Sequence, residues 1–91
     1  MNKRKTEQLA NSFSALGHPV RLQILQILIE QGACFAGDIT RRLPVVASTA
    51  SQHLKILREA GLIDQATDGP HRYYSINKHA MLDLKARVRK L

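Results

Sequence analysis

Short polar side chains recur along one side of a helix that the sequence predicts from about Ala47 to Ala60. Ala50, Leu54 and Leu57 form its apolar stripe, with His53 at the edge. At about 100° per residue the opposite side is polar, and it carries Ser48, Gln52, Lys55 and Glu59, flanked by Thr49 and Ser51. Serine, threonine and glutamine can hydrogen-bond to base edges in a DNA major groove, and lysine can reach a phosphate or a guanine. An ordinary solvated helix presents a similar polar side, so the choice between a DNA-binding helix and a solvated one depends on the neighbouring elements.

Those neighbouring elements fit a DNA-binding arrangement. A short helix over Ala36 to Leu43 precedes, closed by Pro44, and a gap of three or four residues between two helices is the helix-turn-helix spacing. Gly61 takes the position just after the second helix. Two strands, Leu62 to Thr67 and Arg72 to Ile76, then flank a turn headed by Asp-Gly, which predicts a β-hairpin wing.

The rest of the chain is predicted to be helical. Apolar residues at helical spacing predict a helix from Thr6 to Leu16, a nearly all-apolar one from Pro19 to near Gly32, and a last one from Asn77 onward. No linker or repeat interrupts this order, so we expect a single domain over residues 1–91. The predicted fold class is α+β, mostly α: a winged helix-turn-helix with helices plus a two-stranded β-hairpin wing.

Composition narrows the partners. Fourteen Lys and Arg residues against seven Asp and Glu give a formal charge of +7, which favours nucleic acid or an anionic membrane surface as partner. The most apolar stretch, Ile24 to Ile29, is too short to span a bilayer, and the first residues lack the apolar run of a signal peptide. A single cysteine excludes an intrachain disulfide. We therefore expect a cytoplasmic protein with no membrane partner.

Three stretches carry a family resemblance. The run from Ser48 to Ile63, STASQHLKILREAGLI, resembles the recognition helix and first wing strand of ArsR/SmtB regulators. Leu16 to Leu25 (LGHPVRLQIL) and Asp68 to Tyr74 (DGPHRYY) are similar to that family's second helix and wing. The resemblance implies a winged-helix fold, dimerisation through the terminal helices, and repression by blocking access to a promoter. One departure is Val45-Val46, where the family usually has a polar N-cap; Thr49 and Gln52 offer a capping box one turn later.

Several side chains have competing roles. Arg72 in the wing either contacts DNA or is solvated or paired with Asp68, and only one of Tyr73 and Tyr74 can face the core. On the largely apolar second helix, we expect Arg21 to form an ion pair with an acidic group, with a phosphate contact as second choice. His18 is interpreted as a residue of the helix start. The residues predicted to contact DNA are Ser48, Thr49, Ser51, Gln52, Lys55, His71 and Arg72.

Apolar stripes on the terminal helices exceed what one small domain can bury. Part of each stripe must cover the core, and a second subunit would cover the remainder in a symmetric dimer. The predicted interface of this homodimer consists of Leu9, Phe13, Leu16, Met81, Leu84, Val88 and Leu91.

Metal and cofactor sites are not predicted. Relative to the two cysteines that soft-metal sensors of the family carry, Cys34 is out of register, and a thiolate pair within one subunit needs a second cysteine. On the last helix, His79 and Asp83 are four residues apart and are interpreted as a surface pair. The sequence does not identify an effector.

The sequence therefore predicts a regulator of transcription that binds double-stranded DNA and represses from a palindromic operator. The alternative is a winged-helix protein-interaction module without DNA binding, since a fold alone does not fix a function. Paired carboxylates, a nucleophile-base signature and a phosphate loop are all lacking, so we do not expect an enzyme.

Overall fold

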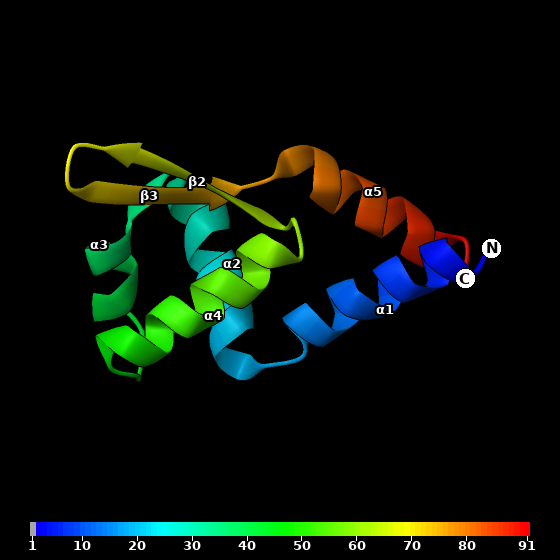
Figure 1. The fold of residues 1–91 in the computed structure, drawn as a ribbon, viewed down its shortest axis with the longest axis horizontal. Helices are drawn as coiled ribbons and strands as arrows, with labels where there is room; N and C mark the ends of the chain where they lie inside the picture. The colour runs from blue at the N-terminus through cyan, green and yellow to red at the C-terminus, as the bar shows by residue number, and fades with distance from the viewer. Residues whose placement is uncertain (1) are drawn as a thin grey trace.

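The computed structural model describes residues 2–91, so the predicted domain of residues 1–91 is covered except for Met1. Five helices and three strands make up this part of the chain (Figure 1). In chain order they are α1 (Lys3–Leu16), α2 (Pro19–Gln31), β1 (Cys34–Phe35), α3 (Ala36–Arg41), α4 (Ala47–Glu59), β2 (Ile63–Asp68), β3 (His71–Ile76) and α5 (Lys78–Arg89).

Side-chain caps set the starts of the first two helices. The Asn2 side chain accepts a hydrogen bond from the backbone N–H of Lys5 at 2.8 Å, so α1 begins at Lys3 and not at Thr6 as predicted. His18 is the N-cap of α2, where its Nδ1 accepts from the backbone N–H of Val20 at 3.1 Å. The interpretation of His18 as a helix-start residue is therefore confirmed.

The helix-turn-helix consists of α3, α4 and the turn between them. α3 ends at Arg41, two residues earlier than predicted, because Pro44 disfavours the helical conformation of the residue before it. α4 begins at Ala47, and its N-cap Val46 makes no side-chain hydrogen bond. The predicted capping box of Thr49 and Gln52 is wrong, since both residues lie inside the helix.

Two glycines allow the chain to reverse after α4 and at the wing tip. Gly61 follows the C-cap of α4 with φ of 77°, the left-handed conformation that glycine adopts without strain. In the wing, Asp68 pairs with His71 and Gly69 has φ of 60°, as the two-residue hairpin turn requires.

The small sheet has three strands and not the predicted two. β3 lies in the middle, antiparallel to both β2 and β1, with Cys34 opposite Tyr74 and Phe35 opposite Tyr73. A strand of two residues is too short to show alternation in the sequence. β1 joins the wing to the segment between α2 and α3.

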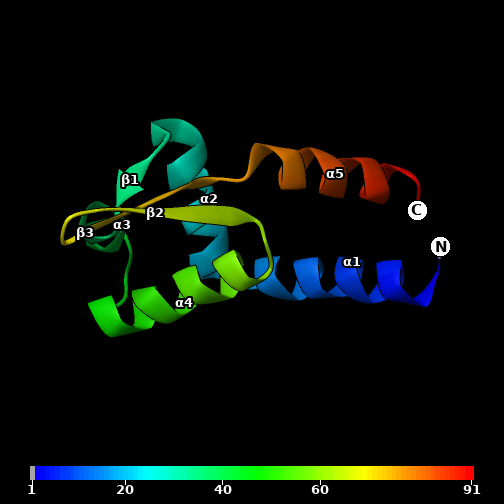
Figure 2. The ribbon, with the colours of Figure 1, turned by 45° about the horizontal axis from the view of Figure 1, so that its top comes forward.

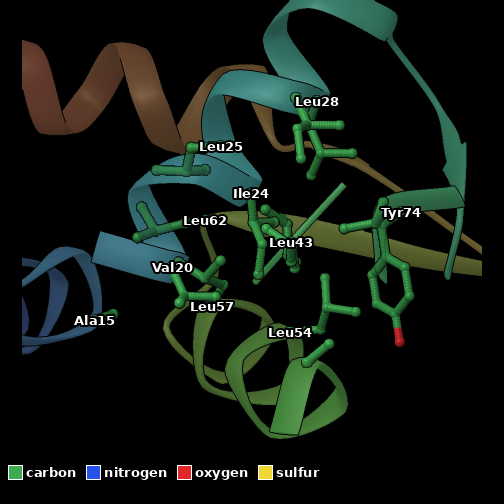
Figure 3. Close-up of a cluster of buried hydrophobic side chains, with 14 of the residues drawn as sticks. Ala15, Val20, Ile24, Leu25, Leu28, Leu43, Leu54, Leu57, Leu62 and Tyr74 are labelled. Carbon is green, nitrogen blue, oxygen red and sulfur yellow. The ribbon is translucent and has the colours of Figure 1, made fainter. Parts of the chain in front are cut away.

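One buried apolar cluster holds these elements together (Figure 3). Its largest fully buried side chains come from α2, α3, α4 and β2 and the residue before β2: Ile24, Leu28, Ile39, Leu54, Leu57, Leu62 and Ile63. Tyr74 completes the cluster at 3% exposure, with its hydroxyl pointing away from the cluster (Figure 3). The buried stripe of α4 thereby fixes which side of that helix faces outward.

The two terminal helices extend together from this body. α1 and α5 lie side by side at one end, while the wing turn and the start of α4 lie at the other (Figures 1 and 2). Among residues 2–91, none of the helices has both the length and the apolar character needed to cross a bilayer.

Candidate nucleic-acid interface

The outward side of α4 is polar and accessible. Ser48, Ser51, Gln52 and Lys55 are exposed and Thr49 is half-buried. On the opposite side Ala50, Leu54 and Leu57 are at most 1% exposed. The core packing therefore holds α4 in one rotation about its axis, with the predicted base-reading residues directed to solvent.

A hollow of about 220 Å³ lies between α4 and the wing. It brings together three of the predicted residues on α4 with one from the wing, and it adds three residues that were not predicted to contact DNA. The lining consists of Ser51, Gln52, Lys55, Arg58, Gln65, Arg72 and Tyr74. Three of these side chains are cationic, so the hollow suits a phosphate group. Ser48, Thr49 and His71 lie outside it.

One hydrogen bond and one ion pair lie at the edges of this hollow. Arg58 donates from its guanidinium to Gln65 Oε1 at 2.7 Å, which joins α4 to β2. Lys55 Nζ lies 3.7 Å from Glu59, an exposed pair one turn along α4. Exposed pairs of this kind contribute little stability, so Lys55 can exchange Glu59 for a phosphate at small cost.

Sequence reasoning missed Arg58 and Gln65, although a signal for the arginine was present. Arg58 follows Lys55 by three residues, which places the two cations on adjacent turns of one helix side. Gln65 offered no such signal, because its position beside Arg58 depends on how the wing folds back onto α4.

In the wing, His71 and Arg72 are both exposed, as their predicted roles require. Arg72 lines the hollow, and it is not among the ion pairs formed within residues 2–91, so its predicted alternative pairing with Asp68 is not formed. Tyr74 is the buried tyrosine and Tyr73 packs against Phe35 with ring centroids 4.1 Å apart. The expectation that only one tyrosine faces the core is confirmed.

Arg21 does not form the predicted ion pair with an acidic group. Its guanidinium donates to the backbone carbonyl oxygens of Ala15 at 2.5 Å and Ser14 at 3.3 Å, and to His53 Nδ1 at 3.1 Å. These carbonyls belong to the last turn of α1, where carbonyl groups lack the regular helical partner and carry partial negative charge, so they take the place of a carboxylate. Ser14 O also accepts from the backbone N–H of Gly17 at 3.2 Å.

The apolar residues of the terminal helices divide by burial. Leu9 and Leu84 are 6% and 8% exposed within one subunit, so they form part of its core. Leu16 and Met81 are half-buried against that core. Phe13, Val88 and Leu91 remain 44%, 43% and 77% exposed, and Leu82, which was not predicted as an interface residue, is 67% exposed.

The surface pair predicted for His79 and Asp83 is wrong, because Asp83 pairs with Arg87 Nε at 3.0 Å. Cys34 is a half-buried free thiol in β1. Within the described residues, no three His, Cys, Asp or Glu side chains gather in a way that could hold a metal ion.

Known proteins resemble this chain in both sequence and fold. A family model described as a helix-turn-helix domain matches residues 16–66, more than half of the chain. The HTH-type transcriptional regulator YgaV of Escherichia coli is 41% identical over 75 residues, which cover 82% of this chain and 76% of that protein. The arsenical resistance operon repressor of Bacillus subtilis is 40% identical over 74 residues, covering 81% and 68%.

Solved structures match over almost the whole chain. The homodimeric winged helix-turn-helix DNA-binding domain of a possible ArsR-family regulator from Mycobacterium bovis aligns with a TM-score of 0.79 at 32% identity, covering 98% of this chain and 84% of that one. The winged helix-turn-helix fold predicted from the sequence is therefore confirmed, and the family is one of regulators and not of enzymes. The chain belongs to the ArsR/SmtB family of helix-turn-helix transcriptional regulators.

Proposed function

We propose that this is a cytoplasmic protein that binds double-stranded operator DNA as a homodimer and thereby represses transcription. The observation that carries the proposal is the cationic hollow between α4 and the wing, beside an exposed row of hydrogen-bonding side chains. Support also comes from the named function of the Bacillus subtilis relative, a repressor, and from the homodimeric DNA-binding domain of Mycobacterium bovis.

Two kinds of contact follow from the side chains. The exposed face of α4 would enter the major groove, where Ser51 and Gln52 hydrogen-bond to base edges and Ser48 and Thr49 lie near the start of the helix. Lys55, Arg58 and Arg72 would surround one backbone phosphate, held in the hollow where the DNA strand passes from helix to wing. His71, at the exposed wing turn, would approach the neighbouring minor groove.

The homodimer would form through α1 and α5. Phe13 and Val88 keep more than two fifths of their surface exposed after the subunit core has formed, and Leu91 and Leu82 keep more. A two-fold axis through this end of the molecule lets one patch serve both subunits. The same axis would set two α4 helices about 34 Å apart, in successive major grooves of a palindromic site.

Selection of bound sequences from a random duplex pool tests the proposal, followed by affinity measurements on the selected site at several salt concentrations. We expect a palindromic consensus and an affinity that falls steeply with salt, as phosphate contacts require. A folded protein that selects no sequence and shows no salt-dependent retention on duplex DNA would contradict DNA binding. That outcome would favour the alternative of a protein-interaction module.

A further inference from the structure

Three basic side chains meet where α1, α2 and α4 come together. Arg21 of α2 holds the last carbonyls of α1, at Ser14 and Ala15, and reaches His53 of α4 with the same guanidinium. The ring of His53 lies 4.4 Å, centroid to centroid, from the ring of His18, the N-cap of α2. Arg21 thus connects a terminal helix to the recognition helix.

The chemistry of the Arg21 donor fixes the position of the proton on the His53 ring. A guanidinium has no acceptor, so the bond between Arg21 and His53 requires a lone pair on His53 Nδ1. His53 is therefore neutral in this arrangement, with its ring proton on Nε2. His18 uses its own Nδ1 lone pair to accept from the backbone N–H of Val20.

The surroundings of His53 disfavour a positive charge. The charged or titratable groups that face it are Arg21 of α2 and His18, the N-cap of that helix, while α1 contributes only backbone carbonyls, to Arg21. Burial, and then the neighbouring His18 and Arg21, lower the pKa of His53 below its ordinary value. Every carboxylate that forms an ion pair in residues 2–91 does so with Lys55, Arg41, Arg42 or Arg87, and none compensates this cluster.

We propose that Arg21 is a positioning residue that aligns α4 with α1 through His53, and that protonation of His53 breaks this link and weakens DNA binding. An imidazolium would place an N–H opposite the guanidinium at 3.1 Å, so the hydrogen bond is replaced by repulsion between like charges. α4 then loses the contact that connects it, through Arg21, to α1. The inference rests on the proposed function, because it concerns regulation of the same recognition helix.

The direction of the pH effect follows from linkage. In the linked form the pKa of His53 is lowered, and release would take its ring away from the Arg21 guanidinium, so the released form would bind a proton at His53 more readily. Acidification therefore favours release, beginning as the pH falls through the ordinary pKa of histidine and continuing through the lowered pKa of His53. One proton limits the change to about tenfold in affinity per pH unit.

His53→Asn is the matched variant, because an asparagine Oδ1 replaces Nδ1 as an acceptor for Arg21 and does not titrate. Operator affinity would be measured from pH 8 to pH 5 for the wild type, for His53→Asn, and for His71→Asn, which removes the wing histidine. We expect equal affinity of the wild type and His53→Asn at pH 8, and a growing deficit of the wild type on acidification. The same deficit should separate the His71→Asn single variant from the double variant His53→Asn/His71→Asn.

Parallel pH profiles of the wild type and His53→Asn would overturn the inference. A second measurement needs no DNA: an NMR titration of the free protein, following the His53 ring and the backbone amides of Leu16 and Gly17. We expect these signals to shift with one midpoint below the ordinary histidine pKa, and the two amides to lose that transition in His53→Asn. If the wild type does not bind DNA even at pH 8, the proposed function is contradicted but the inference about His53 is not. The titration of the free protein would then test whether protonation of His53 breaks its link to Arg21.

Discussion

Gln52 and Lys55 lie on adjacent turns of the exposed side of α4, but they can interact with DNA in different ways. A glutamine amide both donates and accepts, so it distinguishes one base edge from another, whereas a lysine is a flexible point charge. Gln52→Ala should reduce the preference for the operator over random DNA by about 1–3 kcal/mol. Lys55→Ala should weaken binding to all sequences and lower the salt slope by about one unit. Equal losses on operator and random DNA for Gln52→Ala would reject its assignment.

Arg58 combines two roles that a pair of variants can separate. Its guanidinium lines the cationic hollow and also donates to Gln65 of the wing. Arg58→Ala should lower the salt slope of DNA binding by about one unit, because one phosphate contact is lost. Gln65→Ala keeps the cation and should leave the slope unchanged, with a smaller loss of affinity from the freed wing. The two slopes, measured on one operator duplex, check this; a reduced slope for Gln65→Ala would contradict it.

At the scale of the helix, α4 begins without a side-chain cap. Val46 occupies the N-cap in an extended conformation, with φ of −73° and ψ of 162°, and is 68% exposed. Serine there can accept from a backbone N–H of the first turn, so Val46→Ser should raise the free energy of unfolding by about 1 kcal/mol. Urea denaturation measures this change. Val45→Ser, one residue outside the cap, is the control and should not stabilise; equal stabilisation by both would contradict the assignment of the cap.

The elements were predictable wherever periodicity and end signals agreed. Helix α4 was found almost to the residue, because Ala50, Leu54 and Leu57 recur at helical spacing and Gly61 marks the end. The start of α1 was missed, since residues 3–5 are polar and add nothing to the apolar pattern. β1 was missed because its pairing with Tyr73 and Tyr74 is a contact between distant parts of the chain.

Four of the residues that line the hollow were predicted from the sequence, three on α4 and Arg72 in the wing. Ser51, Gln52 and Lys55 followed from the direction of the α4 stripe, which needs no knowledge of the rest of the fold. The partner of Arg21 could not be predicted, because the carbonyls that it binds carry no sequence signal. The link from Arg21 to His53 joins residues 32 positions apart, so it depends on the packing of α2 against α4.

At the scale of the whole molecule, α5 has apolar side chains on two faces. Leu84 is buried against the subunit core, whereas Leu82 is 67% exposed. Two residues apart on a helix correspond to a turn of about 200°, so these side chains point in nearly opposite directions. Val88 lies nearer the side of Leu84, yet it is beyond the reach of the core and 43% exposed. The face used by a second subunit can therefore be mapped by placing a charge at each position separately.

Leu84→Glu, Val88→Glu and Leu82→Glu should have different consequences. Leu84→Glu buries a carboxylate without a partner and should cost several kcal/mol of subunit stability, so its effect on dimerisation would be indirect. Val88→Glu and Leu82→Glu place the charge at exposed positions, where the isolated subunit should tolerate it. Whichever of these two lies in the interface should yield a folded monomer by sedimentation and circular dichroism. The same variant should still bind a single half-site, which an unfolded protein would not do. Its affinity for the palindrome should fall, because it loses the gain from simultaneous contact with both half-sites. If both variants remain dimeric and bind the palindrome as the wild type does, the proposal that α5 forms the dimer interface is wrong.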